Sequence, residues 1–246
     1  MKKIAIILFC ALIILAVSTI STVYCEEKQQ EKDEKNVKQE GGHKLFFKFQ
    51  KKADTGMPSN RVALASRGKG DDRLYLSALV PEDIGITYTS TPSLCWFMSK
   101  PANASLELAL NDEISAEPLL EKQLTNIKTG GVHCINLKDY AVELKQDIEY
   151  QWFISVVPDP NNRSNDITDS GLIKYVEASD ELKTKLSKSK GIDVPALYAS
   201  EGGWYDALSS ITELINANPS DKSLLDERAF LLEQVQLLKA AEYDRK

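Results

Sequence analysis

The sequence predicts an antiparallel β-sandwich of the immunoglobulin or fibronectin type III kind, followed by a C-terminal helical hairpin. Three observations lead to this mostly β fold with an α tail. Between residues 74 and 176, eight short apolar or alternating runs are separated by breaks rich in Pro, Gly, Asn and Asp. No long helical pattern lies between these runs, which excludes the βαβ units of a parallel sheet. After Glu177 the apolar residues take the spacing of an amphipathic helix.

The N-terminus predicts an exported protein. Two lysines precede a strongly apolar run over residues 4–17, and small polar residues follow it, which is the order of a secretory signal peptide. The apolar run is short for a membrane-spanning helix, which needs about 20 residues. We therefore take residues 1–25 as the signal peptide and expect the protein in the periplasm or outside the cell. A lipidated Cys25 and an uncleaved membrane anchor are the alternatives.

Residues 26–72 are expected to form a charged linker and a loop. The part up to residue 42 is almost purely Glu, Lys, Gln and Asp, so it has little apolar surface to bury. An apolar patch around Phe49 follows, which is either an edge strand or a docking segment. The formal net charge of −6 does not provide the basic face of a nucleic-acid-binding protein, so we expect no nucleic acid as a partner.

The sandwich domain is expected over residues 73–177, close to the usual size of an immunoglobulin-like domain. The expected strands are 74–80, 86–89, 93–99, 105–110, 119–124, 132–137, 149–157 and 172–176. Successive side chains of a strand point to opposite faces, so Trp152 shares one face with Tyr150 and Ile154. Trp96 and Trp152 are the residues that we expect at the centre of the core.

Cys95 and Cys134 are a candidate disulfide pair. The alternation that turns Trp96 and Ile135 inward turns both cysteines outward, and their strands would be neighbours in one sheet. Both sulfurs then lie on one face, in an oxidising compartment. A bridge that closes a loop of about 40 residues would stabilise the fold by roughly 4 kcal/mol in the chain-entropy model. Two unpaired thiols are the alternative, because cross-strand bridges are strained.

Residues 178–246 are expected to form a helical tail. A charged helix is expected over residues 180–190, and a second helix carries an apolar stripe that begins at Trp204. The stripe consists of Trp204, Ala207, Leu208, Ile211, Leu214 and Ile215. A third helix is expected over residues 223–239, with the Ser-Asp pair at 220–221 available as its N-cap.

This tail resembles one tetratricopeptide unit. The residues that stand at the intervals of that repeat are Tyr198, Gly202, Gly203, Ala207, Ile211 and Pro219. The early Trp and Gly positions of the motif are Gly191 and Pro195 here, and stacked repeats need at least about three units. We therefore expect a helical hairpin that packs on the sandwich or on a partner.

The sequence offers no catalytic constellation. A Ser-His-Asp triad would need His133, which lies in an expected strand without a Gly-x-Ser-x-Gly elbow. Cys134 points to the opposite face of that strand and no Cys-x-x-Cys occurs, so we expect no zinc site. The loop 158–167 has oxygen ligands that suit calcium, but it lacks the Gly and the terminal Glu of an EF-hand loop. We expect no catalytic residues, no metal and no cofactor.

Several motifs, in a specific order, resemble the domain of unknown function 928 family. They include RVALASRG at 61–68, LVPE at 79–82, PSLCWF at 92–97, PLLE at 118–121, YQWFISVVPDP at 150–160 and WYDAL at 204–208. The resemblance extends over about residues 56–238. It implies an exported bacterial protein without an assigned activity, and it supplies no catalytic residues. The chain departs from the family at Cys95, where members often carry Tyr.

Two non-enzymatic functions are expected. The first is an envelope protein that acts as an interaction or scaffold module, with another envelope protein as its partner and the tail or a sandwich edge as the docking surface. The second is a sandwich that binds a small ligand or a carbohydrate through aromatic residues on one sheet face, such as Phe97, Phe153 or Tyr175. The residues expected to form the interaction surface are Trp204, Tyr205, Phe230, Phe97 and Phe153.

An enzyme is the third hypothesis. A cleft that gathers Glu82, Asp83, Asp112 or Asp166 with strongly shifted pKa values would support it. The sequence leaves the oligomeric state open, and it predicts membrane contact only through an uncleaved anchor or a lipid.

Overall fold

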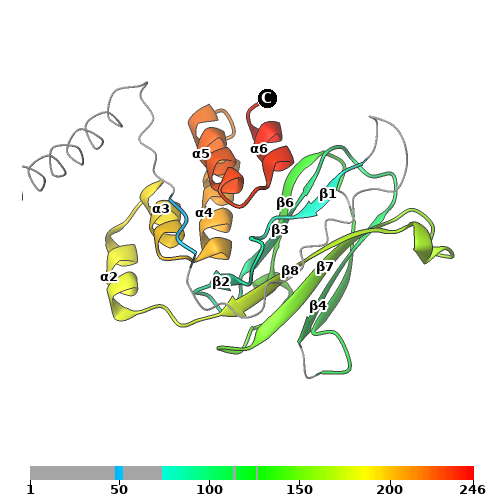
Figure 1. Cartoon of the computed structure of the whole chain (residues 1–246), viewed down its shortest axis with the longest axis horizontal. Coiled ribbons are helices and arrows are strands. Elements are labelled where there is room, and N and C mark those ends of the chain that lie inside the picture. Colours follow the sequence, from blue (N-terminus) through cyan, green and yellow to red (C-terminus); the bar gives the residue numbers. More distant parts are fainter. Residues whose placement is uncertain (1–47, 52–73, 113–114, 126) are drawn as a thin grey trace, which may run out of the picture. The chain divides into compact units, whose positions relative to one another are not determined.

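The computed structural model describes residues 48–51, 74–112, 115–125 and 127–246. The predicted signal peptide and nearly all of the predicted linker lie outside the described residues. Within these ranges, eight strands form two mostly antiparallel open sheets, and α-helices follow the last strand (Figure 1). In the same ranges, no helix is both long enough and apolar enough to cross a membrane.

Sheet A has three antiparallel strands in the order β1–β3–β6. Its strands are β1 (Leu76–Ala78), β3 (Ser93–Met98) and β6 (Gly131–Asn136). Sheet B has five strands in the order β2–β8–β7–β4–β5, and all its pairs are antiparallel except β2 with β8. Its strands are β2 (Gly85–Thr87), β4 (Ser105–Asp112), β5 (Leu120–Leu124), β7 (Glu149–Val157) and β8 (Ile167–Tyr175).

All eight predicted strands are present, and β8 differs most from its expected bounds. It begins at Ile167, five residues before the predicted start at 172. Polar residues such as Thr168 and Ser170 alternate with buried ones in this added part, and they face solvent across from β7. A strand with one solvated face alternates in this way. The prediction, which rested on the apolar run alone, therefore made the strand too short.

The two sheets enclose the predicted core. Trp96 of β3 and Trp152 of β7 are both fully buried, which confirms their expected place. Leu94 and Met98 share the face of Trp96, and Ile154 shares that of Trp152, and all three are fully buried as well. The strand alternation therefore predicted correctly which side chains of these two strands turn inward.

The tail contains more helices than the hairpin that we expected. They are α2 (Asp180–Lys188), α3 (Asp193–Ser200), α4 (Trp204–Ala217), α5 (Lys222–Glu233) and α6 (Leu238–Asp244). The third predicted helix, at 223–239, is divided into α5 and α6 because Gln236 adopts a left-handed φ of 61°. Helix α3 was not predicted; its Pro195 lies in the first turn, where proline is tolerated.

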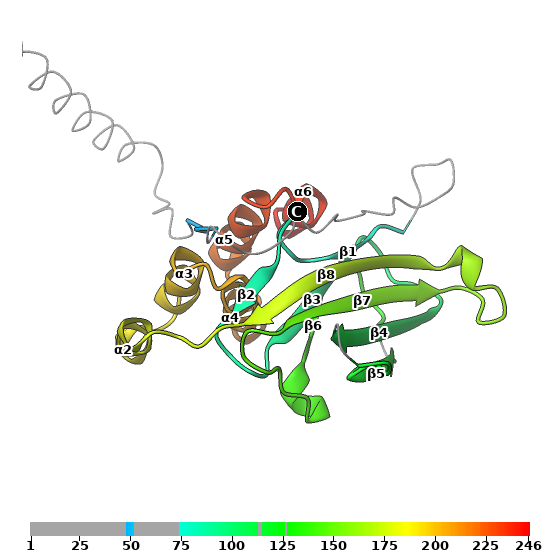
Figure 2. The ribbon, with the colours of Figure 1, turned by 60° about the horizontal axis from the view of Figure 1, so that its bottom comes forward.

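Two of these helices, α4 and α6, cover sheet A rather than extend away from the sheets. Helix α4 contacts β2 and β3, and α6 contacts β6. Figure 2 shows the helices on one side of the sheets, with β7, β4 and β5 on the other. Sheet A therefore lies between sheet B and a helical layer, which explains why every residue of β3 is buried.

The described part of the N-terminal segment is a docking segment. The Phe49 N–H donates to Gln234 Oε1 at 2.8 Å, and the Phe49 ring lies edge-on to Trp204 with ring centroids 5.1 Å apart. The Gln50 N–H donates to the Ala199 carbonyl at 3.0 Å. Residues 48–51 thus contact α3, α4 and the end of α5, and they pair with no strand.

Candidate functional site

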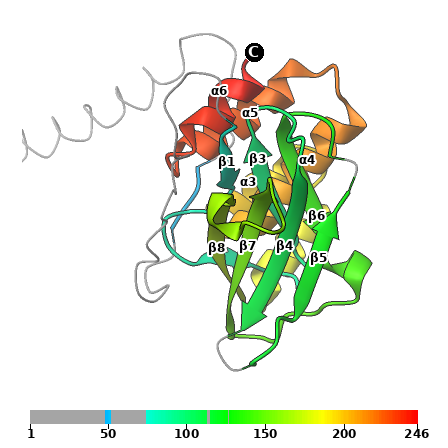
Figure 3. The same ribbon diagram turned by 90° about the vertical axis from the view of Figure 1, so that its right-hand side faces the viewer.

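The outer face of sheet B is a surface on which none of the described α-helices packs (Figure 3). The strand registers place Ser170, Phe153, Ala109 and Glu121 side by side across β8, β7, β4 and β5. The next row along the strands contains Leu172, Gln151 and Asn111. Phe153 is half-buried and Gln151 is exposed, so this face presents an aromatic ring beside polar side chains, with the exposed carboxylate of Glu121 on β5.

Ion pairs occupy the two ends of this face. Near one end, Arg163 Nη2 lies 2.7 Å from Glu107 Oε2 and Arg163 Nε lies 2.6 Å from Asp166 Oδ2. The hydrogen bond with Glu107 and, to a smaller extent, the hydrogen bond with Asp166 raise the pKa of the Arg163 guanidinium. Near the other end, Lys174 Nζ lies 3.3 Å from Glu149 Oε1. Each cation is thus paired, and the Arg163 end keeps an excess of one negative charge.

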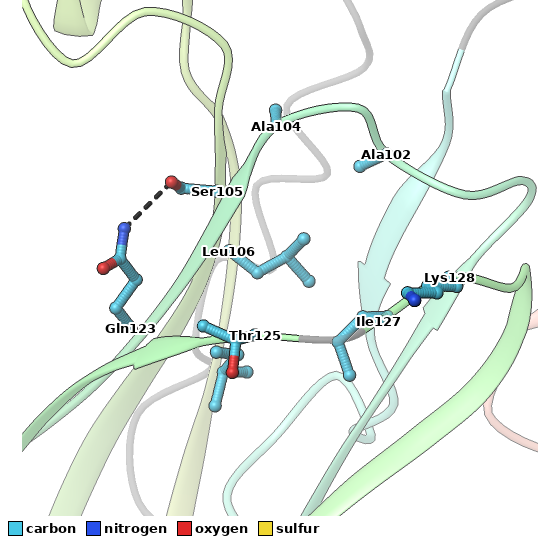
Figure 4. Close-up of a pocket in the computed structure, with 9 residues that line it drawn as sticks. Ala102, Ala104, Ser105, Leu106, Gln123, Thr125, Ile127 and Lys128 are labelled. Carbon is cyan, nitrogen blue, oxygen red and sulfur yellow. Dashed lines mark hydrogen bonds between the residues drawn. The ribbon is translucent and has the colours of Figure 1, made fainter.

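A cleft of about 390 Å³ lies where β4 begins and β5 ends (Figure 4). Its lining combines apolar side chains, neutral polar ones and a single lysine. The residues that line it include Ala102, Ala104, Leu106, Leu124, Ile127 and Lys128. Leu106 points from β4 toward Ile127, and at one side Gln123 Nε2 donates to Ser105 Oγ at 2.9 Å. The cleft has the volume of a small-ligand site, and it opens beside the free edge of β5.

Three of the five residues that we expected at an interaction surface lie in the interior. Trp204 is fully buried, and its Nε1 donates to the Leu79 carbonyl at 2.8 Å. Tyr205 is also buried, and its hydroxyl accepts from Trp152 Nε1 and donates to the Leu172 carbonyl, both at 2.9 Å. Both predictions are wrong because the apolar stripe of α4 is used within the chain.

Phe97 was expected on an exposed face and is 1% exposed. It does point away from Trp96, but α6 covers that side of β3, and the rings of Phe97 and Tyr243 lie 5.4 Å apart. Of the remaining aromatic residues, Phe153 and Tyr175 are half-buried on β7 and β8, and Phe230 is half-buried on α5. Only Phe153 shares the outer face of sheet B with polar neighbours from adjacent strands.

Asp206 joins the first turn of α4 to β2. Its Oδ2 accepts from the Tyr88 N–H at 2.8 Å, and its Oδ1 accepts from the Thr87 hydroxyl at 3.2 Å. Burial among these neutral donors raises the pKa of Asp206 to about 7, although the hydrogen bonds partly oppose the shift. The carboxyl thus titrates near neutral pH at the contact between the helical layer and sheet B.

The predicted disulfide is present between Cys95 and Cys134. The two residues are directly opposite one another in β3 and β6, with Cα atoms 4.1 Å apart. Cys95 is 1% exposed, whereas Cys134 lines a cleft of about 260 Å³ between sheet A and α4. The bridge lies on the outer face of sheet A as expected, but beneath α4 rather than in solvent.

His133 has a structural environment. Its ring stacks on Trp96 with centroids 5.8 Å apart, and its Nε2 lies 3.0 Å from the Thr129 carbonyl oxygen. Burial lowers the pKa of the imidazole, and the Thr129 hydrogen bond partly opposes this shift. These contacts fix the ring on the inner side of an edge strand.

The carboxylates that would have supported an enzyme have separate local partners. Asp83 pairs with Lys51, Asp166 pairs with Arg163, and Asp112 accepts from the Ser115 N–H. In the loop 158–167, Asp159 Oδ1 accepts from the Asn161 N–H at 2.9 Å, as in an ordinary turn. Among the residues that the structure describes, no group of three or more His, Cys, Asp or Glu side chains is arranged to hold a metal ion.

The family comparison agrees with the order of the sequence motifs. The profile of a family described as Domain of Unknown Function (DUF928) matches residues 62–244, well over half of the chain. The chain belongs to the DUF928 family. Among solved structures, a multi-domain immunophilin from Arabidopsis thaliana aligns at 10% identity and a TM-score of 0.19, over 64% of this chain and 96% of that chain. No curated protein matches.

Sequence reasoning missed parts of both surfaces of this DUF928 chain. The alternation on the predicted strand 149–157 places Gln151 on one face with Phe153, whereas Ser170 lies before the predicted start of β8. The residues of the cleft, such as Ala102 and Lys128, lie in connections between strands, where no periodicity marks a shared surface.

Proposed function

We propose that this protein is an exported, non-enzymatic interaction module of the cell envelope. Its recognition element is the free edge of β5 together with the cleft beside it. The partner is an extended segment of another envelope protein, which adds to sheet B as a further strand. Export itself rests on the order of the N-terminal residues, and the disulfide is in keeping with an oxidising compartment.

The single observation that carries this proposal is the position of β5. Among the described residues it is the outermost strand of sheet B, with β4 as its one neighbour in that sheet. An edge strand offers backbone N–H and C=O groups that an extended peptide can pair with. Glu121 and Lys122 place charges on this strand, which disfavours indiscriminate pairing between copies.

The cleft supplies the selectivity that backbone pairing lacks. An added strand directs alternate side chains toward the inner face of the sheet, next to Leu124. At this end of β5 the cleft offers Leu106 and Ile127 as an apolar floor. A peptide with an apolar residue at that position is therefore favoured, and an acidic residue beside it would meet Lys128.

The helical layer serves as support for the sheets rather than as the docking surface. The apolar stripe of α4 is buried against both sheets, so it offers no free groove for a partner. The buried pair of Arg228 and Asp244, at 2.6 Å, ties α6 to α5. A rigid backing of this kind holds β5 and the cleft in one geometry, which lowers the entropic cost of binding.

We also propose that the two sheets are an immunoglobulin-like sandwich. Sheet B would correspond to the sheet that contains the last two strands of such a domain, with β2 as a short parallel partner of β8. Tyr150 supports this assignment, because its hydroxyl accepts from the Lys145 N–H at 2.9 Å. That contact resembles the tyrosine corner before the penultimate strand of immunoglobulin domains.

Site-specific photo-crosslinking in the native envelope tests the proposal. A crosslinking residue in place of Gln123 on β5 should give a defined protein adduct, and the same residue in place of Leu238 on α6 should not. Leu238 is the matched control because it is 49% exposed and lies on the helical layer. Filling the cleft with Ala104→Trp should reduce the Gln123 adduct. Equal adducts at Gln123 and Leu238, or no adduct at Gln123, would rule out the β5 edge as the docking site.

A further inference from the structure

We propose that the outer face of sheet B is a binding site for a neutral oligosaccharide, centred on Phe153. This site is the outer face of the sheet and reaches β5 through the Glu121 side chain, whereas the proposed protein partner pairs with the backbone of the β5 edge, so the inference does not depend on that partner. It follows from the position of the face, from its charge and from the types of side chain that it presents.

The face is available and is built on a rigid support. The inner sides of β7 and β4 hold Trp152 and Leu108, which are fully buried, so the strands beneath the site are fixed by the core. None of the described helices covers the outer side of these strands (Figure 3). Sites on strands hold their side chains more precisely than sites on loops do.

The charge of the face favours a neutral ligand. Arg163 is paired with two carboxylates at one end and Lys174 with Glu149 at the other, so neither cation is left for an anionic ligand. Between the ends, Gln151 and Ser170 offer an amide and a hydroxyl group without charge. A polyanion or a phosphorylated ligand would therefore gain little here.

The side chains match the two kinds of surface that a pyranose ring has. The C–H groups on one side of the sugar pack on an aromatic ring, which Phe153 supplies at half exposure. The hydroxyl groups around the ring both donate and accept, which suits the exposed amide of Gln151. Glu121 on β5 adds an exposed carboxylate that can accept from two neighbouring hydroxyls.

The width of the face suits a chain of sugars rather than a single one. The four strands β8, β7, β4 and β5 are adjacent, and neighbouring strands lie about 4.8 Å apart. Three such steps separate Ser170 from Glu121, with Phe153 between them. An oligosaccharide laid across the strands therefore contacts side chains from each of them.

The test is calorimetric titration of the full chain with cellohexaose, maltohexaose and chitohexaose, three neutral oligomers that differ in linkage and substituent. At least one should bind. Phe153→Ala should weaken that binding at least about tenfold, which corresponds to roughly 1.4 kcal/mol. Gln151→Ala should weaken it as well, and because Gln151 is exposed its loss cannot act by unfolding the core.

Leu238→Ala is the control, since it changes an exposed side chain on the helical layer. Two results would overturn the site: no binding of any of the three oligomers by the unchanged chain, or binding that is the same with and without the Phe153 ring. Neither result bears on the proposed protein partner, because the crosslink from Gln123 in Phe153→Ala reports that interaction independently.

Discussion

The outer faces of the two sheets differ in what covers them, although the same alternation of side chains builds both. On sheet A, the residues that point away from the core include Cys95 and Phe97, and both are buried beneath the helices. On sheet B, the equivalent residues include Gln151 and Phe153, which are exposed and half-exposed. The alternation of side chains thus predicts which residues share a face, but the packing of the C-terminal helices determines which face is exposed to solvent.

The largest effect is expected from Trp204→Ala, which removes a fully buried contact between the helical layer and the segment that follows β1. The indole is fully buried, packs against Phe49 and donates to the Leu79 carbonyl. Truncation of a buried Trp to Ala typically costs about 3–5 kcal/mol. Urea unfolding followed by circular dichroism measures this loss. If the loss stayed near that of Leu238→Ala, the helical layer would not be needed for the stability of the sheets.

Loss of the disulfide should cost nearly as much. Cys95→Ala with Cys134→Ala opens a bridge between residues 39 apart in sequence, and the chain-entropy model gives about 4 kcal/mol for a loop of that length. A reductant should lower the urea midpoint of the unchanged chain and leave that of the double variant unaltered. An unchanged midpoint in both would mean that the bridge does not form or does not stabilise the fold.

Asp206 should make stability depend on pH in an unusual direction. Its pKa is about 7 in the folded chain and 3.8 as an ordinary carboxyl, so between these values the folded state binds more protons than the unfolded state. The stabilisation that Asp206 contributes is therefore complete below about pH 4, decreases as the pH rises to about 7, and stays constant above that. The difference of about three pKa units corresponds to an upper bound of about 4 kcal/mol.

Asp206→Asn isolates this contribution, because an amide oxygen can still accept from the Tyr88 N–H. The unfolding free energy of the variant minus that of the unchanged chain should be larger at pH 8 than at pH 4. Urea unfolding at a series of pH values measures the difference between the two chains and so cancels the other titrating groups. Parallel curves for the two chains would show that the carboxyl is not buried as described.

The sequence allowed the strands and the core to be predicted because their signals are local. Trp96 and Trp152 lie within short alternating runs, and alternation is enough to turn both inward. The disulfide could also be inferred, because Cys95 and Cys134 have the same parity relative to inward residues on neighbouring strands. In each case the alternation within a short run determines the direction of the side chain.

The covering of sheet A could not be inferred in this way. The stripe that begins at Trp204 is apolar whether it packs on the sheets or on a partner, so the pattern alone does not identify what covers it. The choice depends on contacts between residues more than a hundred positions apart, such as that of Trp204 with Leu79. The cleft was missed for a related reason, since Ala102 and Lys128 come from separate connections.

The smallest effect on the unfolding free energy is expected from Phe153→Ala. Its size tests whether the outer face of sheet B is less buried than that of sheet A. The ring is half-exposed and its cross-strand neighbours, Ser170 and Ala109, are small, so its loss should cost about 1 kcal/mol or less. Urea unfolding at several protein concentrations gives the measurement. A cost similar to that of Trp204→Ala, or one that grows with concentration, would mean that another copy of the chain buries this face. In that case an oligosaccharide could reach Phe153 only by displacing that copy. The effect of Phe153→Ala on the unfolding free energy and its effect on oligosaccharide affinity must therefore be interpreted together.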